Sequence, residues 1–293
     1  MTLQQAAFPV KNYDLALTLA SGQAFRWRRN GDAWEGVIGS RWVRLRQEDG
    51  CIHAETAGQE EDWQWLRHYL QTEVDLERIL AAFPDDPPMR EAVAACRGLR
   101  LLRQEPWECL ASFICSSSKQ IVQIEQIVGL LCRRFGPALP LPPGMMAGSF
   151  PTVERLAAAS EAELRECKLG FRAPYLSGTA RKLAAGELDL SRLGELPLEE
   201  ARAALLTLPG VGIKIADCVL LFAYGFQKAF PVDVWITKAL QQIYFPKRGA
   251  KLPRLRHFSR SHFGPYSGYA QQYLFHYMRT RRNPDRANLN EKK

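Results

Sequence analysis

The chain has 293 residues, of which 46% are hydrophobic and 24% are charged. Both fractions are typical of a folded globular protein and exclude a disordered or fibrous one, and no apolar run approaches the roughly 20 residues of a membrane span. The net charge of +8 favours a polyanionic partner, although charge alone is weak evidence.

The first residues lack the basic segment and apolar core of a signal peptide. We therefore expect an intracellular protein with no membrane partner, in the cytoplasm or nucleoid of a bacterium or in the nucleus of a eukaryote. The seven cysteines are scattered without any C-x-x-C pair, which predicts reduced thiols. The same scatter disfavours structural zinc and iron–sulfur clusters, so we predict no metal.

Residues 23–56 carry short aromatic and β-branched runs separated by turn signals, which predicts antiparallel strands. Val43 and Leu45 alternate with Arg44 and Arg46, so one face of this sheet should be buried and the other solvated.

The rest of the chain has mainly helical patterns, broken by proline-rich stretches at 83–88 and 136–144. Ser160 and Glu163 form a capping-box pattern before one helix. The predicted fold class is α+β, with a small antiparallel β domain over residues 1–95 followed by an all-helical body over residues 96–293.

A helix-hairpin-helix is predicted at about residues 201–225. Its first helix should stop at Pro209, the chain should turn through Gly210, Val211 and Gly212, and the second helix should start near residue 213. Glycines at a helix N-terminus leave N–H groups uncovered, where a phosphate can bind. For this short motif taken alone, a plain turn between two helices is the favoured interpretation.

Lys214 lies in the first turn of the second helix among apolar neighbours. The helix dipole and the apolar surroundings both lower an amine pKa, and a neutral amine is a nucleophile suited to Schiff-base chemistry. Asp233, in a loop at about residues 229–235, is expected to cap the next helix. After an apolar strand formed by "KAFPV", this carboxylate can also face the hairpin and stabilise a cationic sugar or manage protons.

Several separated motifs resemble one family. "LPGVGIKIADC" followed by "PVDVW" is similar to the signature of the helix-hairpin-helix Gly/Pro-Asp DNA glycosylase superfamily. Within it, the chain resembles the 8-oxoguanine DNA glycosylases through "SGQAFRW", "LLRQEPWECLASFICSS", "LGFRAPY" and "GYAQQYLF". These motifs span nearly the whole chain in the order found in that family.

The resemblance implies a bifunctional DNA glycosylase and abasic-site lyase of base excision repair that acts on 8-oxoguanine in duplex DNA. Lys214 would attack C1′ of the flipped nucleotide with help from Asp233, and the resulting Schiff base would permit β-elimination. The resemblance assigns four residues to the damaged-base pocket: Gly22, whose carbonyl would meet N7–H, Gln271 at the Watson–Crick edge, and Cys218 and Phe275 on the two ring faces.

The resemblance also assigns DNA contacts. Phe171 would be an aromatic wedge and Arg172 would read the orphaned base, while Gly210, Val211 and Gly212 would meet the backbone. The expected partner is double-stranded DNA containing oxidised guanine, bound by a monomer. No iron–sulfur cluster is expected, and a monovalent cation under the hairpin carbonyls is compatible with the sequence.

Two departures from the family pattern change these expectations. Where the family has an Asn run and a later Arg that contact the cytosine opposite the lesion, this chain has Ser118, Lys119 and Gln123. Ser offers fewer donors than Asn, so we expect fewer hydrogen bonds to that base. A His that contacts phosphate in the family is replaced by Trp235.

Two other functions remain as alternatives. A monofunctional glycosylase for alkylated bases would share the fold and Asp233 but would not need Lys214. A non-catalytic hairpin module that grips DNA would need neither residue. The basic stretch at residues 246–264 either lines the DNA backbone or is a solvated loop.

Overall fold

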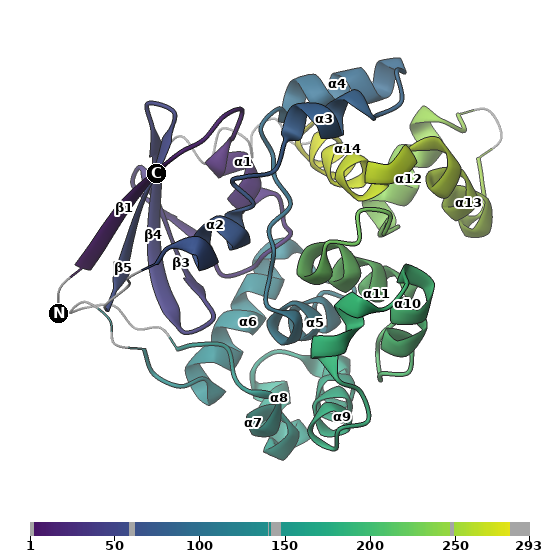
Figure 1. Ribbon diagram of the computed structural model, residues 1–293. Coiled ribbons are helices and arrows are strands. Elements are labelled where there is room, and N and C mark those ends of the chain that lie inside the picture. The colour runs from purple at the N-terminus through teal and green to yellow at the C-terminus, as the bar shows by residue number, and fades with distance from the viewer. Residues whose placement is uncertain (1–2, 59–61, 140, 142–147, 247–248, 282–293) are drawn as a thin grey trace.

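The computed structural model describes residues 3–58, 62–139, 141, 148–246 and 249–281. A small β-sheet lies on one side of a larger group of helices (Figure 1). The α+β fold class predicted from the sequence is therefore confirmed.

The sheet has five strands in the order β1-β5-β4-β3-β2, and all four pairings are antiparallel. The strands are β1 Leu3–Pro9, β2 Arg28–Asn30, β3 Ala33–Ile38, β4 Arg41–Glu48 and β5 Cys51–Ala57. Val43 and Leu45 on β4 are fully buried, while Arg46 is exposed, which confirms the predicted alternation. The helices α1 Leu15–Ala20 and α2 Gln64–Leu70 contribute to the hydrophobic core of this sheet.

The sequence prediction missed β1 and α1 and began the strands too early. Residues 23–27 have no regular structure, and β1 is an edge strand in which Phe8 is the one fully buried side chain. An edge strand with a mostly accessible pattern gives little hydrophobic signal.

The helical body contains the remaining long helices. They are α3 Leu76–Ala81, α4 Pro87–Cys96, α5 Pro106–Cys115, α6 Ile121–Phe135, α7 Val153–Ala158, α8 Glu161–Glu166, α9 Ala173–Ala184, α10 Leu198–Leu206, α11 Ile213–Val219, α12 Val234–Ile243, α13 Leu252–His262 and α14 Ser267–Arg281. Short segments are η1 Gly170–Arg172, η2 Leu190–Glu195, η3 Leu220–Tyr224 and η4 Gly264–Tyr266. The predicted capping box of Ser160 and Glu163 begins α8.

The helical core includes residues from α3 and α4, and α4 packs against α14. Both helices lie before residue 96 except for Cys96, the last residue of α4, so α14, which packs against α4, lies beyond the predicted domain boundary. The boundary itself, as a limit between folding units, stays a prediction.

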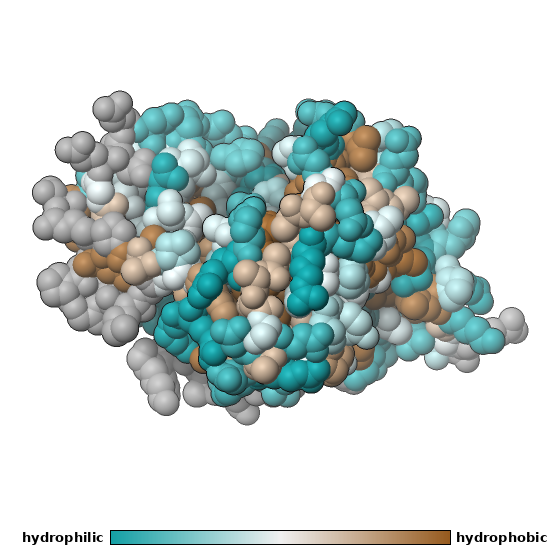
Figure 2. All heavy atoms as spheres, turned by 90° about the horizontal axis from the view of Figure 1, so that it is seen from below, coloured by the Kyte–Doolittle hydropathy of each residue, from teal (hydrophilic) through white to brown (hydrophobic). Residues whose placement is uncertain are grey.

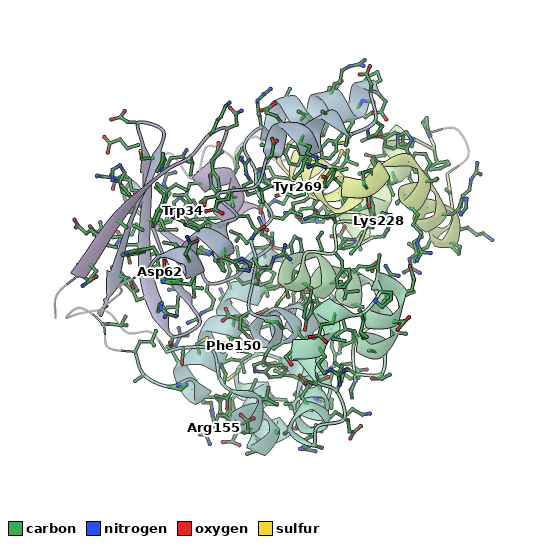
Figure 3. The ribbon with its side chains drawn as sticks, viewed as in Figure 1. Trp34, Asp62, Phe150, Arg155, Lys228 and Tyr269 are labelled. Carbon is green, nitrogen blue, oxygen red and sulfur yellow. The ribbon has the colours of Figure 1, made fainter. Side chains whose placement is uncertain are left out.

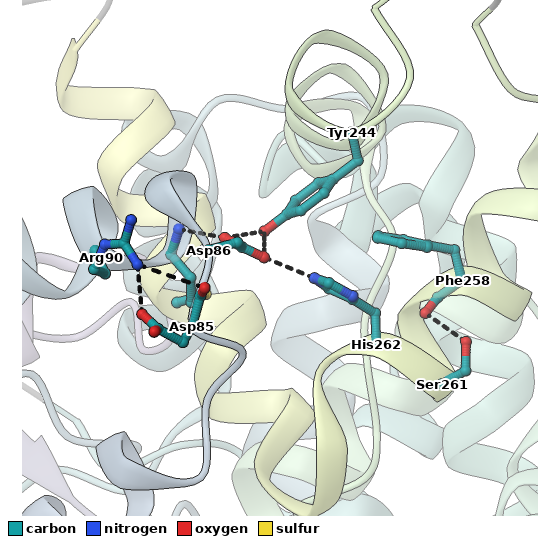
Figure 4. Close-up of polar contacts among 8 residues, drawn as sticks. Asp85, Asp86, Arg90, Tyr244, Phe258, Ser261 and His262 are labelled. Atoms are coloured by element: carbon teal, nitrogen blue, oxygen red, sulfur yellow. Dashed lines mark hydrogen bonds and ion pairs between the residues drawn. The ribbon is translucent and has the colours of Figure 1, made fainter.

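A polar cluster fastens α4 to α12 and α13 (Figure 4). The Asp86 carboxylate caps α4 by accepting from the Met89 N–H at 2.9 Å, and it lies 3.1 and 3.2 Å from the Tyr244 hydroxyl and 2.8 Å from His262 Nε2. Because Tyr244 ends α12 and His262 ends α13, the cluster fixes both helices against the α4–α14 pair.

Figure 2 views the molecule from the side of α7, α8 and α9 and shows a mostly hydrophilic surface with hydrophobic patches between polar residues. Among the described residues, no helix combines the length and apolar character needed to span a bilayer.

Candidate active site

One cavity of about 1840 Å³ lies between the sheet side and the helical body. Its size exceeds the roughly 300–1,000 Å³ of a small-molecule site, so it can take a large substrate. Most of the predicted site residues line this cavity. They are Gly22, Ser118, Lys119, Gln123, Lys214, Cys218, Asp233, Gln271 and Phe275. Phe171, Arg172 and the hairpin residues 210–212 lie outside its lining.

The hairpin consists of α10 and α11, and the second helix starts at residue 213 as predicted. The first helix ends at Leu206, three residues before the predicted stop at Pro209, because residues 207–209 already turn toward the glycines. Gly210 has a φ of +74°, and a Cβ there would lie 2.6 Å from Cβ of Tyr175. The positive φ and the close approach of Tyr175 both require glycine here. The turn therefore packs directly against Tyr175 of α9.

Lys214 is half-buried in the first turn of α11 and reaches into the cavity. Its Nζ donates to Ser116 Oγ at 3.0 Å and lies 5.1 Å from the centre of the Phe113 ring. No carboxylate forms an ion pair with Lys214 in the described part of the chain. The amine is thus held by a neutral hydroxyl and an aromatic face.

Asp233 caps α12 as predicted, accepting from the Ile236 N–H at 2.7 Å. Burial raises the pKa of its carboxyl, while the backbone N–H groups at the helix start and the charge of Lys214 act in the opposite direction. Asp233 and Lys214 therefore line one cavity and interact electrostatically without a direct ion pair.

The apolar strand predicted at "KAFPV" is absent: residues 228–232 have no regular secondary structure. A strand needs a hydrogen-bonding neighbour. Here the Ala229 N–H donates to Phe226 O within a turn, and Gln227 O accepts from the Gly268 N–H at the start of α14, both at 2.8 Å. The segment still delivers Asp233 to the cavity.

Four residues form the predicted base pocket. Cys218 lies one turn after Lys214 on α11, is buried, and has its thiol pKa raised to about 12 by that burial. Gln271 and Phe275 lie one turn apart on α14. Gln271 is 4% exposed and its Oε1 has no hydrogen-bond partner among the described residues. A buried acceptor without a partner indicates a place for a ligand donor.

Gly22 lies on a loop that α14 holds in place. Gln272 Nε2 donates to Ser21 O at 3.1 Å, and Arg279 Nη2 donates to Ala20 O at 2.6 Å. Gly22 has a φ of +81°, and a Cβ there would lie 2.5 Å from Ile121 Cδ1. The positive φ favours glycine at this position, and a side chain there would also force the end of the Ile121 side chain to move.

Residues 118–123, here called the opposite-base segment, lead into α6. Ser118 is exposed with a φ of +55°, and Lys119 is half-buried. Gln123 is exposed, and its Oε1 accepts from the Gln120 N–H at 3.1 Å. The side-chain oxygen of Gln123 is thus already engaged in a hydrogen bond at the start of α6.

Phe171 and Arg172 on η1 differ in exposure. Phe171 is 56% exposed, as a wedge would have to be. Arg172 is 3% exposed, and its Cζ lies 4.1 Å from the centre of the Phe171 ring. Its Nε donates to Ser117 O at 2.7 Å, and its Nη1 donates to Leu169 O at 3.1 Å. Its guanidinium is committed to main-chain carbonyls in this state, and its reading of a base stays a prediction.

The basic stretch at 246–264 forms much of α13, while Lys247 and Arg248 lie outside the described residues. Trp235, at the position of the family histidine, lines the cavity mouth with Lys238 Nζ 5.9 Å from its ring centre.

Sequence reasoning missed two residues of this site. Ser116 is separated from Lys214 by 98 positions, so no local pattern could indicate their contact. His276 is buried beside the cavity, and burial lowers its pKa to about 4, so it is neutral at neutral pH. Its position in "LFHY" gave only a helical pattern.

Two family models match the chain in succession. One, described as 8-oxoguanine DNA glycosylase, N-terminal domain, matches residues 6–110. The other, described as HhH-GPD superfamily base excision DNA repair protein, matches residues 111–260. Their junction lies within α5.

Named relatives match over nearly the full length. The N-glycosylase/DNA lyase OGG1 of Arabidopsis thaliana is 36% identical over 92% of this chain and 79% of its own. A probable N-glycosylase/DNA lyase of Methanothermobacter thermautotrophicus is 31% identical over 92% of this chain and 95% of its own.

A solved structure gives the same picture. The Clostridium acetobutylicum 8-oxoguanine glycosylase/lyase, in complex with dsDNA containing cytosine opposite 8-oxoG, superposes with a TM-score of 0.89 at 32% identity, covering 97% of this chain and 99% of that one. The similarity therefore includes the sheet, the hairpin and α14.

Proposed function

The chain belongs to the 8-oxoguanine DNA glycosylase family within the helix-hairpin-helix base excision repair superfamily, and we propose that it excises 8-oxoguanine from duplex DNA and then cleaves the abasic site through Lys214. It is a DNA glycosylase with lyase activity, as its relatives are named. The residue roles below are proposals.

One observation carries the proposal: a half-buried amine and a half-buried carboxylate line the same cavity as a buried amide whose oxygen has no hydrogen-bond partner among the described residues. The first two are the groups that a glycosidic bond cleavage through an amine nucleophile requires. The third is suited to recognising a base that has left the helix. A protein that only grips phosphate requires none of them.

The first step forms a bond between Lys214 Nζ and C1′ of the flipped nucleotide. The bond from C1′ to N9 of the base breaks, and its electron pair leaves with the base, which takes up a proton. Loss of the amine protons and opening of the sugar ring give a Schiff base between Nζ and C1′. Removal of a C2′ proton then expels the 3′ phosphate by breaking the C3′–O bond.

Ser116 Oγ holds the amine before attack. Its own hydroxyl donates to Phe113 O at 2.7 Å, so a lone pair of Oγ is left to accept from Nζ. This contact places the Lys214 amine at the cavity wall, and no carboxylate of the described residues forms an ion pair with it. Ser116 is therefore proposed as a positioning residue for Lys214.

Asp233 stabilises the positive charge that develops on the sugar as the base leaves. A carboxylate removed from water acts more strongly on a nearby charge than an exposed one does. Asp233 lies at the start of α12, where its second role as a cap fixes its orientation. Its ionised form is the active one in this proposal.

The damaged base would lie between Cys218 and Phe275, with its Watson–Crick edge against Gln271. The unpartnered Gln271 Oε1 would then accept from a donor on that edge. The Gly22 carbonyl would accept from N7–H, the donor that 8-oxoguanine has and guanine lacks. Phe171 would fill the space left in the stack.

The opposite-base segment supports weaker discrimination for cytosine than a longer amide would provide. Ser118 presents a hydroxyl, and the Gln123 amide oxygen already accepts from the backbone at the start of α6. Lys119 contributes a charge without a fixed hydrogen-bonding plane. We propose that the enzyme accepts several bases opposite the lesion.

The test is to trap the covalent intermediate. The protein is incubated with labelled duplexes carrying 8-oxoguanine opposite each of the four bases, and borohydride is added. A covalent protein–DNA band is expected in the wild type and in Lys182→Gln, which changes a half-buried lysine that is paired with Glu187 and lies outside the cavity lining, but not in Lys214→Gln.

The other outcomes separate the alternatives. Base release without a trapped band would mean a monofunctional glycosylase. Tight, salt-dependent duplex binding with neither release nor trapping would mean a binding module and would overturn the proposal.

A further inference from the structure

A second pocket lies on the other face of α11, between α10 and α13. It is lined by Arg202, Ile213, Asp217, Lys228, Phe230, Arg256, Ser259 and Arg260, and is here called the basic pocket. Lys214 and Cys218 face the large cavity, whereas Ile213 and Asp217, one position earlier in each case, face the basic pocket. Figure 3 shows Lys228 between α11 and the helices α12 and α13.

The charge deep in the basic pocket is already compensated. Arg202 is 6% exposed, and its Nε donates to Asp217 Oδ1 at 2.7 Å, while its Nη1 pairs with Glu199. Breaking such a pair would leave a buried charge without a partner. Arg202 and Asp217 therefore form a structural pair that joins α10 to α11.

The rim of the pocket is different. Lys228, Arg256 and Arg260 converge there, and within the described residues their one ion pair joins Arg260 to Glu199 at 3.8 Å, with both side chains more than half exposed. Like charges that converge repel each other, and an exposed pair at this distance offsets little of that cost. An anion bridging the three side chains would remove the repulsion.

The size and place of the pocket define the anion. Its interior volume of about 20 Å³ holds about one water-sized group, so one oxygen of a larger anion can enter while the rest stays at the rim. Ile213, in its lining, directly follows Gly212 of the hairpin turn. A DNA strand that crosses the hairpin has a further phosphate every 3.4 Å or so of helix axis, available to the neighbouring pocket.

We propose that Lys228, Arg256 and Arg260 bind a backbone phosphate of the DNA next to the one at the hairpin. This contact lies outside the chemistry of the large cavity and fixes the register of the strand along α11 and α13. The inference rests on the proposed function in taking duplex DNA as the partner, and on the expected backbone contact at hairpin residues 210–212. Phosphate is also available as the free inorganic ion, and the experiment separates the two sources.

The experiment measures the salt dependence of DNA binding. The affinity for a duplex with a non-cleavable tetrahydrofuran abasic site is measured between about 50 and 200 mM salt, a range over which the loss of a phosphate contact changes the affinity clearly. The proteins compared are the wild type, Lys228→Gln, Arg256→Gln, Arg260→Gln and the triple variant. Arg192→Gln, an exposed arginine 4.0 Å from Glu195 on η2, is the matched control. The triple variant should reduce the slope of log K against log salt by about 1, the value for one lost phosphate contact, and the control should not.

A second arm locates the phosphate. Single neutral methylphosphonate linkages are placed in turn along the strand, and the linkage that weakens wild-type binding but no longer weakens Arg256→Gln binding marks the contact. An unchanged slope in the triple variant, or the same linkage effects in both proteins, would overturn the proposal.

A third arm replaces chloride with inorganic phosphate at constant ionic strength. Competition by phosphate that disappears in the triple variant without any change of slope would assign the site to the free ion and overturn the DNA contact. Base release by the wild type from a duplex containing 8-oxoguanine is measured in parallel. No release would contradict the proposed function, whereas normal release with an unchanged salt slope in the triple variant would contradict this inference alone.

Discussion

The two walls of the large cavity are built differently. On the wall formed by α11, the start of α12 and α14, Cys218 and Gln271 are nearly inaccessible and Asp233 is fixed by its cap. On the wall formed by the opposite-base segment, Ser118 and Gln123 are exposed. The groups proposed for bond breaking are thus held by packing, whereas those proposed for reading the partner strand lie in an exposed segment, where we expect substitution to cost little stability.

The largest expected effect comes from Asp233→Asn on the packed wall. Asn caps a helix as well as Asp does, so the fold should be retained. Loss of the charge should slow single-turnover base release by roughly 10²- to 10⁴-fold, as removal of a group that manages charge or protons does. Rapid-quench measurement of base release, with thermal unfolding as the control, checks both parts.

The pH dependence sharpens this result. Burial raises the pKa of Asp233, so the group is protonated at a pH at which an ordinary Asp, with a pKa near 3.9, is still charged. Base release in the wild type should therefore fall on acidification above that value, and this limb should vanish in Asp233→Asn. Because a raised folded-state pKa means that ionisation costs stability as pH rises, the Asn variant should be at least as stable at neutral pH. A variant that unfolds would contradict the assigned role.

Gln271→Ala should have the next largest effect. It removes hydrogen bonds to the base, each worth about 0.5–1.5 kcal/mol, so two lost bonds predict a roughly 5- to 150-fold loss of base release. The loss should be smaller with abasic-site duplexes, where no base is present. Equal losses of strand cleavage on both substrates would show that Gln271 acts on folding or on Lys214 instead.

Ser116→Ala tests how the nucleophile is held. Loss of one hydrogen bond of about 1 kcal/mol predicts a roughly fivefold slower attack, with DNA affinity unchanged. Ser116→Thr keeps the hydroxyl and should recover most of the rate. If borohydride trapping were equally fast in Ser116→Ala and the wild type, the contact at 3.0 Å would have no part in catalysis.

On the packed wall, Lys214 and Asp233 stand out from local sequence signals, whereas the base-pocket residues were assigned only through the family resemblance. Without that resemblance, Cys218 and Phe275 would be taken for ordinary core residues. Gly210 and Gly22 each combine a positive φ with a close neighbour, so their places in the motifs are fixed by geometry. Lys214 and Cys218 are one helical turn apart, and a turn spacing is visible in any sequence. The hairpin and the fold class followed from such local signals.

Other features depend on contacts that a sequence does not display. The bond between Ser116 and Lys214 joins α5 to α11, and the commitment of Arg172 to Ser117 O joins η1 to the end of α5. The strand expected at residues 228–232 does not form, because none of the strands in the described part of the chain pairs with it. In each case a tertiary partner decided what local propensity left open.

The smallest expected effect, and the most direct test of the comparison, is Ser118→Asn on the exposed wall. Ser118 has a φ of +55°, a conformation that Asn tolerates better than most residues, so the change should not strain the chain. The added amide supplies two donors and an acceptor at the position where the family carries Asn. One new hydrogen bond of about 1 kcal/mol predicts a preference for cytosine over adenine opposite 8-oxoguanine that rises by roughly fivefold.

Single-turnover rates on the two duplexes measure this, with Ser191→Asn, outside the cavity lining, as the control. Because Ser118 is exposed and packs against little, thermal stability should stay within about 0.5 kcal/mol of the wild type. A large loss of stability would mean that the two walls are equally constrained, and the contrast between them would not hold.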